Sequence, residues 1–274
     1  MPRNALWFAA LVWILSSSIG WAGPMLHVEE AKNALAMGDY KEAVAQYTEA
    51  LGSADLPPRI RAEIFNARGQ AHRGAKQYDD ALADYDAAIR LRPKYVEAYY
   101  DRALAFDQSG QLDRAITQYS QTIHLITAIE AAKLAASVPY PEPVDEMEPA
   151  LEGSFLNRGI LYAKQANYKL AMADFDQAVK LEPDNAKSYD NRGHTRLLSG
   201  DNRGAIADYD RAVQLDPHNA NAFYNLGAAR YFAGDYQGAA GDWRRALEVA
   251  PPGWPMRPDA EDGIKKAEEK FKPN

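Results

Sequence analysis

Cysteine is missing altogether from this chain of 274 residues. Without a thiol the protein forms no disulfide, has no cysteine nucleophile and holds no metal through sulfur, although the compartment in which it works is left open. Basic residues are outnumbered, with 31 lysines and arginines against 38 aspartates and glutamates and a formal net charge of −7. That balance argues against nucleic acid or an anionic membrane as the main binding partner.

Motifs of catalysis and of cofactor binding are also missing. No metal-ligand spacing such as H-x-x-x-H occurs among the histidines, which are His27, His72, His124, His194 and His218. No serine occupies a Gly-x-Ser-x-Gly elbow, and the glycines do not gather into a phosphate-binding loop. We therefore expect no enzyme, no metal and no cofactor.

Acidic residues recur in pairs around an aromatic residue. The pairs keep the same position relative to the surrounding apolar pattern, and they are Asp84/Asp86, Asp174/Asp176 and Asp208/Asp210. Such recurrence at one register is typical of a solvated, ion-paired helix face and not of a general acid and base.

Long apolar runs are rare, and one stands at the beginning of the chain. Residues 1–22 combine one basic residue, an apolar run over Ala5–Leu15 and an end rich in small side chains. Gly20 and Ala22 precede a possible cut before Gly23 in the way that a secretory signal peptide requires. We therefore predict a periplasmic or secreted protein that is cleaved near Ala22/Gly23. The alternative is an uncleaved membrane anchor, since further apolar residues bring the run to about the minimum span.

One unit repeats along the rest of the chain, and residues 186–219 show it best. Its first half has helical periodicity and ends at Gly200, which suits the left-handed turn that closes a helix. Asp201 follows as a cap for a second helix, and Pro217 ends that helix. Gly193 and Ala205 are small where two helices would pass closely. Each unit is thus predicted to be a helical hairpin that cannot bury its own apolar face.

Six copies of this unit cover residues 24–57, 62–95, 96–129, 152–185, 186–219 and 220–253, each 34 residues long. The fourth copy shows the recurring residues in order: Phe155, Gly159, Ala171, Phe175 and Pro183. The period and the pattern resemble the tetratricopeptide repeat, W-x2-L-G-x2-Y…A-x3-F…P. The resemblance implies an all-α fold, an α-solenoid in which helical hairpins form a right-handed superhelix.

An insertion at 130–151 separates the third copy from the fourth. The helix before it is predicted to run on to about Val138, because one apolar face continues through Ile123, Ile126, Ala131 and Leu134. The prolines and acids that follow favour an extended segment, which is either a solvated connector or a segment that binds a partner or covers the groove.

Residues 254–274 follow the last copy. From Asp259 to Phe271 one helical face holds Ala260, Ile264, Ala267 and Phe271. The last repeat of a solenoid exposes an apolar face that needs a cover. We therefore predict a capping helix here, with a short tail.

The family resemblance also implies a binding surface. In the family, the first helices of successive repeats line the concave face, and asparagine at the sixth position often holds the ligand backbone. That register holds Asn157, Asn191 and Asn225, and neighbouring groove positions hold His194, Leu197, Leu198, Tyr224, Tyr231 and Phe232. The alternatives are local hydrogen bonds for the amides and packing against the next helix for the aromatic rings.

We predict a protein-interaction adaptor or scaffold of the cell envelope that binds a peptide or protein segment in this groove. The acidic balance favours a basic or neutral partner, not a nucleic acid, and a membrane only if the first segment stays uncleaved. The alternative is a self-associating structural subunit, which the predicted capping helix disfavours because it covers one end.

Overall fold

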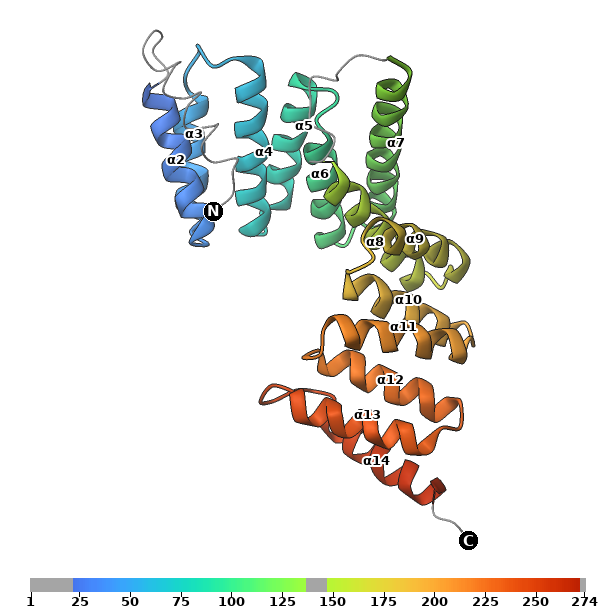
Figure 1. Ribbon diagram of the computed structural model, residues 1–274. Coiled ribbons are helices and arrows are strands. Elements are labelled where there is room, and N and C mark those ends of the chain that lie inside the picture. Colours follow the sequence, from blue (N-terminus) through green and yellow to red (C-terminus); the bar gives the residue numbers. More distant parts are fainter. Residues whose placement is uncertain (1–21, 137–146, 272–274) are drawn as a thin grey trace. The chain divides into compact units, whose positions relative to one another are not determined.

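The computed structural model describes residues 22–136 and 147–271 (Figure 1). In these two ranges thirteen α-helices follow one another and no strand forms. The predicted all-α architecture is therefore confirmed. The predicted signal peptide up to residue 21, the proline-rich part of the insertion at 137–146 and the last three residues lie outside the described ranges.

The chain divides into two compact units, residues 1–150 and 151–274. Unit 1 contains three helical hairpins. Their helices are α2 (Ala22–Ala36), α3 (Tyr40–Leu51), α4 (Pro58–Gly74), α5 (Tyr78–Leu91), α6 (Val96–Gln108) and α7 (Leu112–Ala136). Each helix packs against the next one in the chain, and Figure 1 shows the six side by side.

Unit 2 contains three further hairpins and a closing helix. Its helices are α8 (Glu148–Lys164), which begins just before the boundary, α9 (Tyr168–Leu181), α10 (Ala186–Leu198), α11 (Asn202–Leu215), α12 (Ala220–Phe232), α13 (Tyr236–Val249) and α14 (Arg257–Phe271). From α9 onward successive helices pack together, as Figure 1 shows. Hydrogen bonds from Asn185 and Ser188 to the buried Glu152 carboxylate, both 3.0 Å long, tie α8 to the start of α10.

In four of the six hairpins the two helices meet where a glycine of the first faces an aromatic ring of the second. A Cβ atom added to Gly69 would lie 2.7 Å from the Tyr85 ring, and one added to Gly159 would lie 2.8 Å from the Phe175 ring. The same contact recurs in the last two hairpins, between Gly193 and Tyr209 and between Gly227 and Trp243. Because these rings are buried and touch the glycine backbone, the position has no room for a larger side chain.

Arginine–carboxylate pairs join the helices beside each of these contacts. Arg158 donates two hydrogen bonds to Asp174, at 2.7 and 2.8 Å, and Arg192 binds Asp208 in the same way at 2.6 and 2.9 Å. Arg192 also donates to Asp176 of the preceding hairpin, at 2.8 Å. The ion pairing predicted for the paired acids is therefore confirmed.

The solvation predicted for the paired acids is wrong for the first acid of each pair. Asp84, Asp174 and Asp208 are buried, whereas the second acids Asp86 and Asp176 are half exposed. Burial raises the pKa of Asp174 in spite of its arginine partner. The first acid thus lies between the packed helices, where the bidentate arginine compensates its lost hydration.

A left-handed residue closes the first helix of most hairpins. Gly200 has φ +89° and Gly234 has φ +87°, and the Asp201 side chain accepts a hydrogen bond from the Gly204 N–H at 2.9 Å. Both the predicted turn and the predicted cap are confirmed. Two hairpins make the same turn without glycine, at Lys76 with φ 60° and at Ala166 with φ 56°.

The extended helix before the insertion is confirmed, since α7 continues to Ala136. Its predicted face is partly wrong: Ile126 and Ile129 are buried, whereas Leu134 is 88% exposed. The buried stripe therefore ends at Ile129, about two turns before the end of the helix.

The predicted capping helix is confirmed, with its first residue at Arg257 instead of Asp259. It packs on α13 through Ala260, Gly263 and Ala267, and a Cβ atom added to Gly263 would lie 2.9 Å from the Trp243 ring. Phe271, predicted on the buried face, is 54% exposed. The buried stripe follows small residues because the indole of Trp243 occupies the space between the helices.

We expect Gly193→Leu to destabilise unit 2 by about 1–3 kcal/mol, because a Cβ atom there already lies 3.2 Å from Asp208 Cβ and from the Tyr209 ring. The measurement is thermal and urea unfolding followed by circular dichroism. Gly241→Leu is the control, since Gly241 is exposed in α13 and a Cβ atom there meets nothing within 4 Å. Equal midpoints for the two variants would contradict close packing at Gly193.

Ala166→Gly should stabilise the protein by roughly 1 kcal/mol, because an L-residue pays a steric cost at φ 56° that glycine avoids. The same exchange at Ala173, exposed within helix α9, should destabilise by about 0.5–1 kcal/mol. Chemical unfolding of both variants tests the pair. A lowered midpoint for Ala166→Gly would show that the turn is not strained.

Candidate functional site

The first helices of successive hairpins lie on one side of each unit. In unit 1, α4 approaches α6, and in unit 2, α10 approaches α12 and α12 approaches α14. The second helices of neighbouring hairpins do not come as close to one another within the described ranges. The side on which neighbours crowd together is the inner side of a curved stack. We call the first-helix surface of unit 2 the inner face, and it is the surface that contains the predicted groove residues.

The predicted asparagines lie on the inner face, where they make contacts within the protein. Asn225 donates from its amide nitrogen to the Asp190 carboxylate at 3.5 Å, across the junction between α10 and α12. Asn191 donates to the backbone carbonyl of Lys187 at 2.8 Å, within its own helix. Asn157 is half-buried in α8. The alternative of local hydrogen bonding thus holds for the amide nitrogen of Asn191, and ligand binding by the three amides stays a prediction.

The apolar residues predicted for the groove fall into two groups. Leu198 and Phe232 end α10 and α12 at equivalent positions of their repeats and are 50% and 67% exposed. His194 is also exposed, one turn before Leu198. These three side chains are available to a partner.

The second group belongs to the protein interior. Leu197 packs against the cluster around Tyr209. The ring of Tyr231 lies 5.2 Å from that of Tyr236 and 5.8 Å from that of Trp243, centroid to centroid. For Tyr231, packing against neighbouring helices is therefore the observed role, with one edge left toward solvent.

Tyr224 forms the link between the inner face and the closing segment. Its ring meets Trp254 edge to face at 5.9 Å, and the Trp254 indole nitrogen donates to Asn221 at 2.8 Å. Burial, together with the nearby Asp259 carboxylate, raises the pKa of the Tyr224 phenol. Tyr224 stays half-buried and neutral, so it offers a partner an aromatic edge and a hydroxyl.

Unit 1 has a polar cluster at the corresponding surface, which the sequence analysis did not single out. The buried Asp101 carboxylate of α6 accepts from Gln70 at 2.6 Å and from Asn66 at 3.1 Å, and the Arg73 guanidinium lies 3.6 Å away. Burial raises the pKa of Asp101. The only sequence signal is a run of polar residues one helical turn apart on α4, a pattern that also occurs on solvated faces.

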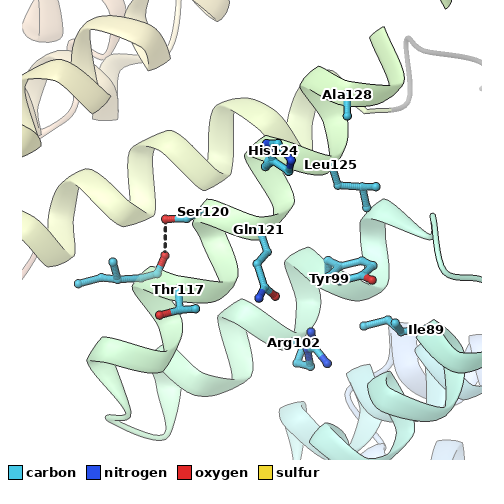
Figure 2. A pocket seen from close by; sticks show the side chains of 10 residues that line it. Ile89, Tyr99, Arg102, Thr117, Ser120, Gln121, His124, Leu125 and Ala128 are labelled. Atoms are coloured by element: carbon cyan, nitrogen blue, oxygen red, sulfur yellow. Dashed lines mark hydrogen bonds between the residues drawn. The ribbon is translucent and has the colours of Figure 1, made fainter. Parts of the chain in front are cut away.

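A recess lies elsewhere in unit 1, between α5, α6 and α7, and Figure 2 shows it. It is an open groove of about 930 Å³ with an apolar lining and a polar rim; the lining residues include Ile89, Tyr99, Ile116, Leu125, Arg102 and His124. Arg102 is held there by Asp86 at 2.5 Å and Gln118 at 2.6 Å. Sequence reasoning missed this groove, although the unusual length of α7 marks the element that forms one wall.

The described part of the chain was also searched for other kinds of site. It holds no group of three or more histidine or acidic side chains placed to bind a metal ion. None of its helices is both long enough and apolar enough to span a membrane.

Comparison with sequence families gives three matches in different parts of the chain. Residues 66–125 and 153–185 match families described as tetratricopeptide repeat, and residues 193–232 match one described as TPR repeat. Among individual proteins, DnaJ homolog subfamily C member 7 of Mus musculus is 31% identical over 93 residues. That alignment covers 34% of this chain and 19% of the relative, so the likeness is confined to a fraction of its length.

Solved structures share the fold at lower identity. MamA from Desulfovibrio magneticus RS-1 superposes with a TM-score of 0.56 at 19% identity, over 69% of this chain and 94% of that one. YrrB, described as a TPR protein with an unusual peptide-binding site, superposes with a TM-score of 0.55 at 18% identity, over 81% of this chain and 97% of that one. Repeated hairpins, the glycine–aromatic contacts and three family matches agree: the chain belongs to the tetratricopeptide repeat family.

Proposed function

We propose that the protein is an adaptor that binds a segment of another protein on the inner face of unit 2. The observation that carries the proposal is the pair Leu198 and Phe232, which end equivalent helices and remain exposed, with the half-buried Tyr224 earlier on the second of these helices. Large apolar side chains are costly to leave in water, and a partner that covers them gains binding energy. The amide groups of Asn157, Asn191 and Asn225 supply polar contacts along the same face.

The relatives support this class of function. YrrB is described as a TPR protein with an unusual peptide-binding site, and the mouse relative is described as a DnaJ homolog. Neither description names a catalytic activity for which this chain has the residues. We propose a binding role without catalysis on these grounds. The formal charge of −7 favours a basic or neutral partner.

The alternative of a self-associating subunit is less well supported. Growth of a solenoid from end to end requires an open apolar face on its last hairpin. In this protein α14 covers that face of α13 through Ala260 and Ala267, both fully buried. The acids Glu261 and Asp262 of α14 are exposed, which gives the outer side of the cap a polar surface.

The cell envelope is the compartment that we propose for this adaptor. The proposal rests on residues 1–22, where an apolar run precedes Gly20 and Ala22. An adaptor in this compartment would bind other exported proteins.

Replacing Leu198 and Phe232 together by alanine should weaken partner binding by tenfold or more, since aromatic anchors in interfaces cost about 2 kcal/mol when truncated. Both side chains are largely exposed, so stability should change by less than about 0.5 kcal/mol each. Tyr231 is not replaced, because its ring packs on Trp243. A partner captured from an envelope extract and then purified is titrated calorimetrically against both proteins.

Leu170→Ala is the matched control for this experiment. Leu170 is 42% exposed on α9, a second helix, and lies away from the inner face. It should leave the affinity unchanged. If the double variant binds as tightly as the wild type, the partner uses another surface, and the open groove between α5, α6 and α7 is the next to test.

Export predicts a mature chain that begins at Gly23. N-terminal sequencing of the protein isolated from its native host measures this directly. In Ala22→Arg the small residue required before the cut is lost, so the full-length chain should accumulate. A wild-type protein that keeps Met1 and sediments with the membrane would contradict cleavage and favour an anchor.

A further inference from the structure

We propose that Asp190 anchors a basic side chain of the bound segment, so that the inner face of unit 2 selects partners with a lysine or arginine flanked by apolar residues. This inference rests on the proposed binding function and adds to it the chemical class of the ligand. It arises from the surroundings of one carboxylate and from their contrast with unit 1.

Asp190 is a half-buried carboxylate with few partners. Within residues 22–136 and 147–271 its one hydrogen bond comes from the Asn225 amide at 3.5 Å, which is long for such a contact. Neither lysine nor arginine lies within ion-pair distance of it in the described residues. The arginines of its own helix, Arg192 and Arg196, are both bound to Asp208. His194, one turn further along α10, is the group nearby that can carry a positive charge.

Unit 1 shows how this protein satisfies a carboxylate that it keeps for itself. There too an asparagine and an aspartate connect the first helices of neighbouring repeats, Asn66 to Asp101 at 3.1 Å, with the two residue types exchanged. Asp101 has in addition the Gln70 amide at 2.6 Å and the Arg73 guanidinium at 3.6 Å. At the registers of Gln70 and Arg73, helix α10 has His194 and Leu197, and within the described residues neither donates a hydrogen bond to Asp190. A carboxylate that is removed from water is destabilised unless a cation pairs with it.

A buried hydroxyl beside Asp190 also lacks a partner. Tyr209 is fully buried, and its phenol oxygen makes no hydrogen bond within the described structure. Burial and the neighbouring Asp190 charge both raise its pKa, so the phenol stays neutral and retains its proton. An ammonium or guanidinium group donates hydrogen bonds, and the half-buried Asp190 carboxylate can accept them, whereas the fully buried Tyr209 phenol lies out of a partner's reach.

The surroundings specify what flanks the cation. The Asp190–Asn225 contact lies between α10 and α12, the helices that end in the exposed side chains Leu198 and Phe232. Tyr224, next to Asn225, presents an aromatic ring. A segment with apolar residues near a lysine or arginine would therefore meet apolar, aromatic and anionic groups on one surface.

The test uses two pools of short peptides with randomised apolar flanks. One pool has lysine at the central position, and the other has Nε-acetyllysine, which keeps the length of the side chain and removes its charge. Each pool is passed over immobilised full-length protein, and an enriched sequence is then measured in both forms by fluorescence anisotropy. We expect the lysine form to bind tenfold or more tightly, as a charge-assisted hydrogen bond provides.

Asp190→Asn keeps the shape of the side chain and should abolish the preference for lysine. Asp101→Asn makes the same exchange at the carboxylate that is satisfied internally, and it should leave the preference intact. Circular dichroism verifies folding of both variants. Should Asp190→Asn fail to fold, equal binding of the lysine and acetyllysine peptides by the wild-type protein would still refute the anchor.

Two results would overturn the proposal. Equal binding of the two peptide forms by the wild type, or an unchanged preference in Asp190→Asn, would refute the anchor while the binding function stands. Capture of neither pool would refute both the anchor and the proposed peptide-binding face.

Discussion

The contact between a glycine and an aromatic ring is the constraint on which four of the six hairpins of this protein depend. With no Cβ atom at Gly69, Gly159 or Gly227, the first helix comes close enough to rest on a ring of the second. That approach buries the ring completely in the case of Tyr85 and Phe175. Each hairpin has little other apolar surface. The distance between its two helices therefore decides how much apolar surface is buried.

The arginine–aspartate pairs follow from the same geometry. Helices that pass closely bring the arginine before the glycine, such as Arg158 or Arg192, beside an aspartate of the second helix, and in the last hairpin Arg230 takes this role. The aspartate loses water, and the bidentate guanidinium replaces it. Arg192 also reaches Asp176 of the preceding hairpin, so one side chain ties a hairpin together and holds it to its neighbour. The acids that recur along the chain are thus ion-paired within and between the hairpins.

The inner face differs from this interior in what it leaves unsatisfied. Leu198 and Phe232 stay exposed, and Asp190 has a single long hydrogen bond where Asp101 of unit 1 has amide and guanidinium partners. Asp101 and Asp190 thus differ because different polar residues stand at the neighbouring positions. The first carboxylate stabilises the fold, and the second is open to a ligand. Binding specificity in a repeat protein can change in this way without altering the scaffold.

The sequence by itself determined the hairpins, their turns and their order, since glycine, alanine and aromatic residues recur at a spacing that only close-packed helices require, as with Gly193 and Tyr209. It also indicated the register of the groove. Only the tertiary structure decided which members of that register face a partner, because exposure depends on side chains distant in sequence: Trp243 and Tyr236 take up Tyr231, whereas Phe232 beside it stays in solvent. The sequence also did not show that Asp190 has no arginine partner. Arg192 and Arg196 of the same helix pair with Asp208 instead. Helical periodicity does not predict which partner a long side chain reaches.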